Sequence, residues 1–73
     1  MDRVEILKMI FEDAGIFNAD TDINRDLELD SLQVINVILG IEDNFLLRVS
    51  SYVKSYEELK TFKDYLDLID SFL

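Results

Sequence analysis

Apolar residues recur at helical spacing in three stretches of the chain. In the first stretch, from Asp2 to Ala14, one helix face carries Val4, Leu7, Ile10, Phe11 and Ala14. Asp2 precedes Glu5 by three residues, which resembles the spacing of a capping box, and Gly15 is a natural C-terminal stop. The pattern therefore predicts a first helix that ends before Gly15.

The second and third stretches carry the same kinds of signal. A helix is expected from about Ser31 to Phe45, with Asp30 as its N-cap and Gln33 completing the capping motif. A last helix is expected to begin near Thr61, its N-cap, with Asp64 in its first turn. The apolar stripe of this last helix consists of Phe62, Tyr65, Leu66, Ile69 and Leu73.

The segments between these helices complete the expected fold. A single helical turn fits residues 56–60, whereas residues 47–53 could pass for a strand, although one strand has no partner here. Residues 16–30 lose the helical pattern and are rich in Asn, Asp and Thr, which is typical of a loop. We therefore predict one all-α domain over residues 1–73. It is a four-helix bundle with three main helices, a short third helix and a long loop between helices 1 and 2.

The long first loop is unusual, because compact helical domains mostly join their helices with a few residues. We expect it to be ordered against the bundle, because it has five apolar residues that can pack there: Ile16, Phe17, Ile23, Leu27 and Leu29. The region is also strongly acidic, since residues 12–30 hold seven Asp and Glu residues against Arg25 alone.

The acidic residues of this loop alternate like the start of an EF-hand calcium loop, at Asp20, Asp22, Asn24 and Asp26. The remainder of that motif is missing. Arg25 stands where the motif needs Gly for the turn, and Ser31 stands where it needs a bidentate Glu. We therefore predict a solvated acidic loop and no dedicated metal site.

Composition narrows the possible functions. The chain has 73 residues and a net charge of −9, which repels nucleic-acid phosphates and anionic membrane surfaces. It has no His and no Cys, so the commonest general base and the thiol nucleophile are both missing. No segment resembles a signal peptide or a membrane span. We expect a cytoplasmic protein that is not an enzyme and binds neither nucleic acid nor membranes.

The most informative motif is the run Asp26-Leu27-Glu28-Leu29-Asp30-Ser31-Leu32, which leads into the second helix. It resembles the attachment site of acyl carrier proteins and peptidyl carrier domains, whose pattern is Asp-Leu-Gly-x-Asp-Ser-Leu. The order of helices and loops over nearly the whole chain is similar to that family as well. The resemblance implies that a phosphopantetheinyl transferase attaches 4′-phosphopantetheine to Ser31, and that the thiol of this arm carries acyl or aminoacyl groups as thioesters. It also implies that Asp30 helps to hold the divalent metal during the transfer.

Simple chemistry agrees with an acceptor role for Ser31. No candidate base is present to deprotonate its hydroxyl, so Ser31 is a poor nucleophile by itself. The positive end of the second helix favours a phosphodiester there, whereas Asp30 and the acidic loop repel it. Ser and Asp are also common at helix starts, so Asp-Ser-Leu alone favours a plain helix cap, and it is the layout of the whole chain that favours attachment.

The second helix carries two apolar stripes. The stripe of Val34, Val37, Ile38, Ile41 and Phe45 is the better core candidate because of its aromatic end. The other stripe consists of Leu32, Ile35 and Leu39, begins next to Ser31, and is expected on the exposed side. The resemblance implies that this stripe, together with Glu42 and Asp43, contacts acyl-loading, synthase or transferase enzymes that have basic docking patches. The alternative is that the three residues pack on the loop or have no partner.

Three positions depart from the family pattern. Glu28 stands where the family commonly has Gly, and Gln33 and Asn36 are neutral where fatty-acid carriers usually have acids. We therefore expect a carrier of a specialised polyketide, peptide or unusual fatty acyl pathway. We also expect it to be free-standing and monomeric. The alternative function is a non-catalytic acidic adaptor that binds a partner through the exposed face of the second helix.

Overall fold

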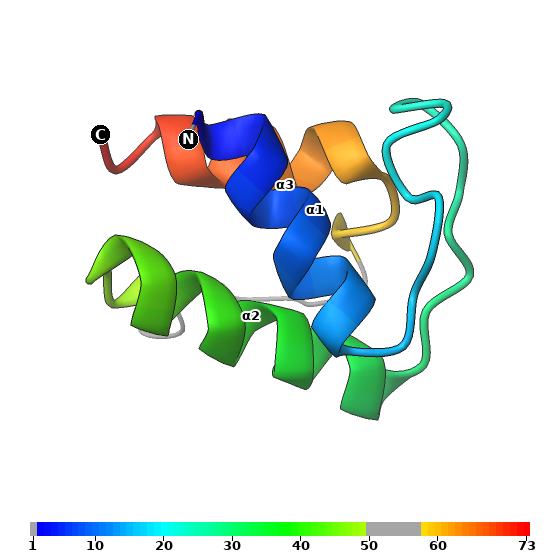
Figure 1. The fold of residues 1–73 in the computed structure, drawn as a ribbon, viewed down its shortest axis with the longest axis horizontal. Coiled ribbons are helices and arrows are strands. Elements are labelled where there is room, and N and C mark those ends of the chain that lie inside the picture. Colours follow the sequence, from blue (N-terminus) through cyan, green and yellow to red (C-terminus); the bar gives the residue numbers. More distant parts are fainter. Residues whose placement is uncertain (1, 50–57) are drawn as a thin grey trace.

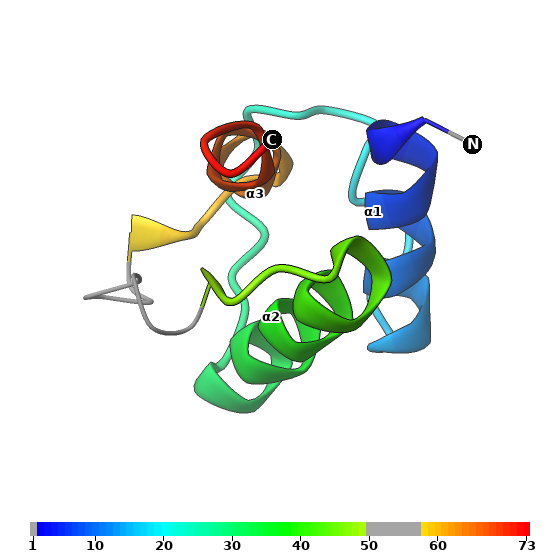
Figure 2. The ribbon, with the colours of Figure 1, turned by 90° about the vertical axis from the view of Figure 1, so that its left-hand side faces the viewer.

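The computed structural model describes residues 2–49 and 58–73, and these residues form three helices and no strand. The helices are α1 (Arg3–Asp13), α2 (Ser31–Phe45) and α3 (Phe62–Asp70). In Figure 1 the long loop runs along one side of the molecule, from the end of α1 to the start of α2. Viewed from the side, the three helices lie at the corners of a triangle (Figure 2). The all-α prediction is confirmed.

All three helices begin at the predicted N-caps. The carboxylate of Asp2 accepts from the N–H of Glu5 at 2.9 Å. Asp30 Oδ1 accepts from the Gln33 N–H at 2.8 Å, and Gln33 Oε1 accepts from the Asp30 N–H at 3.0 Å, which closes a full capping box. Thr61 makes the same reciprocal pair of bonds with the third residue of α3. These predictions succeed because capping depends on residues only three positions apart.

The predicted short third helix is not among the described helices. Residues 56 and 57 of that prediction lie outside the described residues, and residues 58–60 are not α-helical. Of the ambiguous segment 47–53, residues 47–49 do not form a strand, and the rest lies outside the described residues. Within residues 2–49 and 58–73, no helix is long and apolar enough to cross a membrane.

The core is built from the inner faces of the three helices. Its largest fully buried side chains are Tyr65, Phe11, Phe62, Leu7, Ile38, Ile41, Ile69, Val37 and Val49. The Phe11 ring lies 5.6 Å from the Phe62 ring and meets Tyr65 edge-on at 5.2 Å between centroids. Burial raises the pKa of the Tyr65 hydroxyl, which donates to the Leu59 carbonyl at 3.3 Å. Leu73 does not belong to this core as predicted, because α3 ends at Asp70 and the Leu73 side chain is exposed.

Only some of the five apolar residues expected to pack the loop before α2 against the core do so. Ile16, Leu27 and Leu29 are partly buried and pack against the core. Phe17 and Ile23 are exposed, so the prediction was wrong for these two side chains. The buried residue of the loop is instead Ala19, which the sequence analysis did not single out. Its small side chain gives no strong apolar signal.

Backbone hydrogen bonds hold the loop in place where these two side chains do not. The Leu27 N–H donates to the Lys60 carbonyl at 2.8 Å, and the Lys63 N–H donates to the Ile23 carbonyl at 3.0 Å. Asp64 braces the same point, since its carboxylate accepts from the Lys60 N–H at 2.9 Å. Burial opposes ionisation of Asp64, but the N–H groups that donate to it outweigh burial and lower its pKa. The loop is therefore anchored at the start of α3.

Helices α1 and α2 approach each other closely at Gly40. A Cβ atom at this position would lie 2.6 Å from Ile10 Cγ2, well inside van der Waals contact. The branched Ile10 side chain is stiff at this atom, so it cannot easily swing aside. Gly40 therefore sets how near α2 packs against α1.

We predict that Gly40→Ala lowers the free energy of unfolding by about 1–2 kcal/mol, because the overpacking cost exceeds the roughly 1 kcal/mol that Ala gains in a helix. Denaturant titration measures this change. In an Ile10→Ala background the clashing atoms are absent, so Gly40→Ala should cost much less there. A neutral or stabilising Gly40→Ala in the native background would contradict the close contact.

Glu28 adopts a left-handed backbone conformation, with φ of 52°. A side chain with a Cβ pays roughly 1–2 kcal/mol for this conformation, whereas Gly adopts it freely. The Asp26 carboxylate accepts from the Glu28 N–H at 2.8 Å and holds the turn in place. Backbone strain is therefore stored three residues before Ser31.

Glu28→Gly removes the strain of the left-handed conformation, which raises the free energy of unfolding. Gly also loses about 0.5–1 kcal/mol more chain entropy on folding, so the net rise should be only about 0.5 kcal/mol. Glu28→Ala removes the same charge and keeps the Cβ, so it is the matched control. Chemical denaturation of both variants separates the two causes. An equal gain in Glu28→Ala would assign the effect to charge repulsion in the acidic loop and not to the backbone.

Candidate functional site

Ser31 is the first residue of α2, and its side chain is exposed. Its neighbour Asp30 is held in an extended conformation as the N-cap, so the chain turns into the helix at this point. Among the described residues, no hydrogen bond engages the Ser31 hydroxyl. A hydroxyl in this position is accessible to a second enzyme and is not occupied by a structural role.

Asp30 lies beside Ser31 with its orientation fixed. The capping bond to the Gln33 N–H uses Oδ1, which leaves the second carboxylate oxygen uncommitted by that bond. The first N–H groups of a helix point toward its N-terminus and favour an anion there. The site thus combines a carboxylate with the positive end of a helix dipole.

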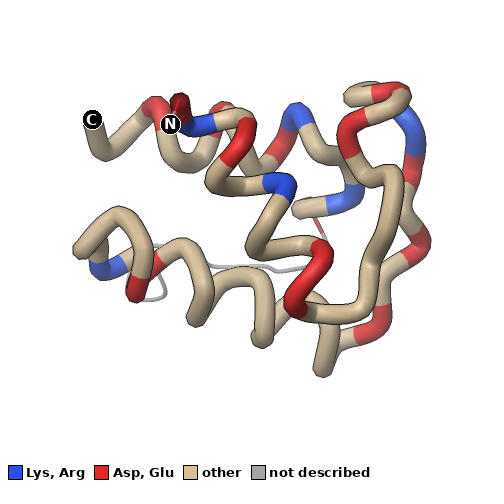
Figure 3. Tube along the Cα trace, viewed as in Figure 1, with Lys and Arg blue, Asp and Glu red and all other residues tan. Residues whose placement is uncertain are grey.

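The acidic loop leads into this end of α2 from one side of the molecule and carries several acidic residues along its path, as Figure 3 shows. Two of its alternating acids shape the local backbone, because Asp22 accepts from the Asn24 N–H at 3.1 Å and Asp26 accepts from the Glu28 N–H. These are Asx-turn contacts. Within the described ranges, no group of three or more acidic side chains is arranged to hold a metal ion.

The second apolar stripe of α2 lies on the surface, as predicted. Leu32, Ile35 and Leu39 are 66%, 42% and 55% exposed, whereas the other stripe has four buried residues and a partly buried Phe45. Leu46, the residue that caps α2 at its C-terminal end, is 89% exposed and extends the stripe. The sequence analysis missed Leu46, although its spacing of seven residues from Leu39 continues the spacing between Leu32 and Leu39.

We define the exposed α2 face as Leu32, Ile35, Leu39 and Leu46. No residue from Ser31 through Ile41 is charged, so most of this face is neutral as well as apolar. In Figure 3 the α2 tube accordingly carries charge only near its two ends. An apolar face of this kind on a chain of net charge −9 is a candidate contact surface.

An open groove of about 420 Å³ lies at the C-terminal end of this face. It is lined by Leu39, Glu42, Asp43, Leu46, Leu47 and Arg48. Three of the predicted partner-binding residues, Leu39, Glu42 and Asp43, therefore meet in one place. The structure adds Arg48, a cation that the sequence analysis did not single out because it follows the helix.

The predicted site residues do not form one cluster. Ser31 and Asp30 lie at the start of α2, and the groove lies at its other end. Glu42 stands eleven positions after Ser31 in the helix, which corresponds to about 16 Å along the axis. The exposed α2 face joins the two ends, so a partner that contacts all of these residues must lie along the helix.

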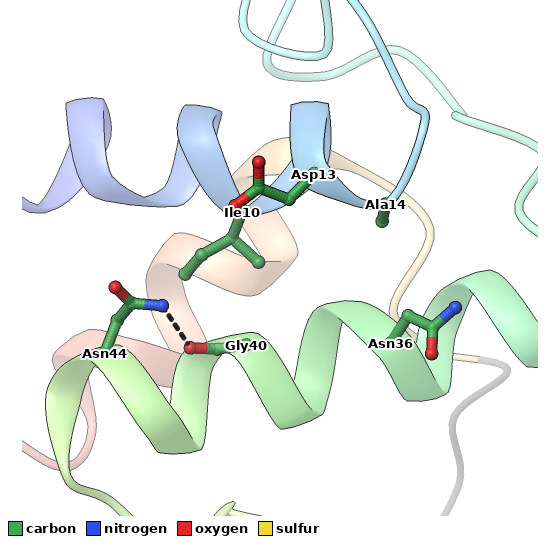
Figure 4. A pocket seen from close by; sticks show the side chains of 6 residues that line it. All are labelled: Ile10, Asp13, Ala14, Asn36, Gly40 and Asn44. Atoms are coloured by element: carbon green, nitrogen blue, oxygen red, sulfur yellow. Dashed lines mark hydrogen bonds between the residues drawn. The ribbon is translucent and has the colours of Figure 1, made fainter.

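A second, smaller pocket of about 130 Å³ lies between α1 and α2 (Figure 4). It is lined by Ile10, Asp13, Ala14, Asn36, Gly40 and Asn44. Asn44 Nδ2 donates to the Gly40 carbonyl at 2.8 Å on its wall. The volume corresponds to a few water molecules, and the pocket lies beside the close approach of Gly40 to Ile10.

Comparison with known proteins adds nothing to the interpretation of this site, which therefore rests on the residues described above. No protein-family model, curated protein or solved structure matches the chain.

Proposed function

We propose that this chain is a carrier that bears 4′-phosphopantetheine on Ser31 and transports acyl or aminoacyl groups as thioesters in the cytoplasm. The observation that carries this proposal is the exposed hydroxyl of Ser31 at the first position of α2. It directly follows the capping Asp30 and lies at one end of the exposed α2 face. The chain itself performs no chemistry in this role, because partner enzymes load and unload it.

At Glu28 the side chain departs from the carrier pattern, but the backbone conformation supports the resemblance. The carrier pattern has Gly three residues before the Ser, and the chain has Glu28 there. Glu28 has a φ of 52°, in the left-handed region that Gly favours. The chain therefore keeps the turn that a Gly would make and changes only the side chain.

The residues around Ser31 fit the proposed arm. The hydroxyl is exposed, and the helix N-terminus stabilises a phosphodiester anion at this position. Ser31 would hold the arm covalently, and Asp30 would assist a divalent metal during attachment. When attached, the arm supplies a thiol to a chain that has no Cys of its own.

The neutral α2 face favours a specialised pathway. Gln33 and Asn36 offer no charge to a basic enzyme surface, so partners would recognise the apolar residues first and the acids Glu42 and Asp43 at the far end. The expected basic docking patches therefore have only this end of α2 to contact. The proposed carrier fold also includes a short helix over residues 56–60, which is not among the described helices.

The alternative is a non-catalytic adaptor that binds a partner along the same face. The observation that favours it is the groove at Leu39 and Arg48, which lies far from Ser31. An adaptor has no need for a hydroxyl at position 31, so modification of Ser31 distinguishes the two functions.

Incubation with coenzyme A, magnesium and a broad-specificity phosphopantetheinyl transferase should add one phosphopantetheine to the protein, as measured by intact mass. Ser31→Ala should gain nothing. Its free energy of unfolding should change by less than about 0.5 kcal/mol, because Asp30 keeps the N-cap.

Peptide mapping of the labelled protein provides the internal control. The remaining Ser and Thr residues lack the Asp-Ser-Leu context; they are Thr21, Ser50, Ser51, Ser55, Thr61 and Ser71. None of them should be labelled. Label on one of these residues, or no label under conditions that modify a known carrier, would favour the adaptor.

Leu39→Asp should slow the labelling of Ser31 about tenfold at low micromolar protein, which corresponds to roughly 1.4 kcal/mol of lost contact with the transferase. The fold should persist, because Leu39 is 55% exposed. Met9→Asp is the matched control, since Met9 is 47% exposed on α1. An unfolded Leu39→Asp protein, or equal slowing in both variants, would contradict docking at this face.

A further inference from the structure

The pocket between α1 and α2 combines an apolar floor with a polar rim. Its floor is formed by Ile10, which is buried, and by Ala14 and Gly40, which are half-buried. Its rim carries three exposed polar side chains, which are Asp13, Asn36 and Asn44. We propose that this pocket binds one arginine side chain of a partner protein that lies along the exposed α2 face.

The pocket lies at the negative end of α1. The last turn of this helix contains no basic residue, and Asp13 adds a carboxylate to the partial negative charge of the terminal carbonyl groups. Among residues 2–49 and 58–73, no hydrogen bond or ion pair engages the Asp13 side chain. The helix dipole and the carboxylate therefore both favour a cation in this pocket.

The two asparagines add acceptors on either side of the pocket. Asn44 rises from α2 toward α1 in Figure 4, and its Nδ2 donates to the Gly40 carbonyl at 2.8 Å. This bond fixes the amide and leaves Oδ1 as the atom that can accept from a ligand. The Asn36 amide lies at the other end of the pocket in the same view. One carboxylate and two amide oxygens suit the five N–H donors of a planar guanidinium better than a compact ammonium.

The floor and the size of the pocket indicate a single long side chain. Ile10, Ala14 and Gly40 offer apolar surface to the aliphatic stem of an arginine, whose charged end stays near water. The volume of about 130 Å³ is on the scale of one side chain and is too small for a helix. Within the described ranges, no group of three or more acidic side chains could hold a metal ion, which favours an organic cation.

A partner on the exposed α2 face can reach this pocket directly. Asn36 stands four positions after Leu32 and three before Leu39, so it neighbours both leucines on the helix surface. The leucines offer contact area without a preferred direction, whereas the Asp13 carboxylate fixes the orientation of the partner. Asp13 was not among the predicted partner-binding residues, because it belongs to a different helix. The inference goes beyond the proposed function, since it applies to a carrier and to an adaptor alike.

A soluble arginine analogue tests the pocket. In an NMR titration at constant ionic strength, N-acetyl-arginine methylamide should shift the backbone amide signals of Asp13 and Gly40 and the side-chain amide signals of Asn36 and Asn44. We expect a dissociation constant of about 10 mM, because the pocket is open and its carboxylate is exposed. The citrulline analogue has nearly the same shape and no charge, so it should bind several times more weakly.

Two variants of α1 separate the pocket from general electrostatics. Asp13→Asn should weaken binding of the arginine analogue roughly fivefold. Glu12→Gln is the matched control, because it removes the same charge from the same turn and Glu12 does not line the pocket. It should bind as the native protein does. Both side chains are exposed, so both variants should keep the fold. Equal loss in the two variants, or equal binding of the citrulline analogue, would overturn the proposal.

Disulfide tethering tests access from the exposed α2 face. The chain has no Cys, so Leu39→Cys supplies one attachment point. In a glutathione redox buffer, this variant should capture a thiol that ends in guanidinium several times more readily than a thiol of equal length that ends in urea. Adding Asp13→Asn should abolish the preference. No preference for guanidinium, or equal capture of an ammonium thiol, would overturn the proposal. No transferase or coenzyme A is used, so the outcome does not depend on whether Ser31 is modified.

Discussion

The capping box between Asp30 and Gln33 is the interaction on which the candidate site depends. It fixes the residue at which α2 begins, because both partners satisfy N–H groups that the first turn leaves unpaired. Ser31 is consequently the first helical residue and faces solvent. From this start, the helical repeat turns Val34, Val37 and Ile38 into the core and leaves Leu32, Ile35 and Leu39 outside. One local motif thus positions both the hydroxyl and the apolar face.

Charge is distributed unevenly over this small protein, and the proposed function uses this distribution. The acidic loop leads directly into the uncharged part of α2, and Ser31 stands at the boundary between them in the sequence. Under the proposed function, a partner enzyme that approaches Ser31 meets negative charge on one side and an apolar surface on the other.

Two contacts of α1 hold the helices together. Gly40 lets α2 approach Ile10, and the bidentate ion pair between Arg3 and Asp70 joins the start of α1 to the end of α3, with Nε to Oδ1 at 2.6 Å. That ion pair is exposed, so its contribution to stability is small. The close contact at Gly40 brings α2 against α1 and keeps the opposite stripe of α2 on the surface.

The sequence by itself determined the three described helices, their starts and the division of α2 into a buried and an exposed stripe, since caps and periodicity act over three or four residues. Only the tertiary structure decided which loop residues are buried: Ala19 is buried, whereas Phe17 and Ile23 are exposed. The backbone bonds of Leu27 to Lys60 and of Lys63 to Ile23 fix the second half of the loop against the start of α3. Arg48 joined Leu39 in the groove because the backbone changes direction after α2 at Leu46, whose φ is 56°. These outcomes depend on segments that are distant in sequence or on a change of backbone direction, and no local pattern encodes either.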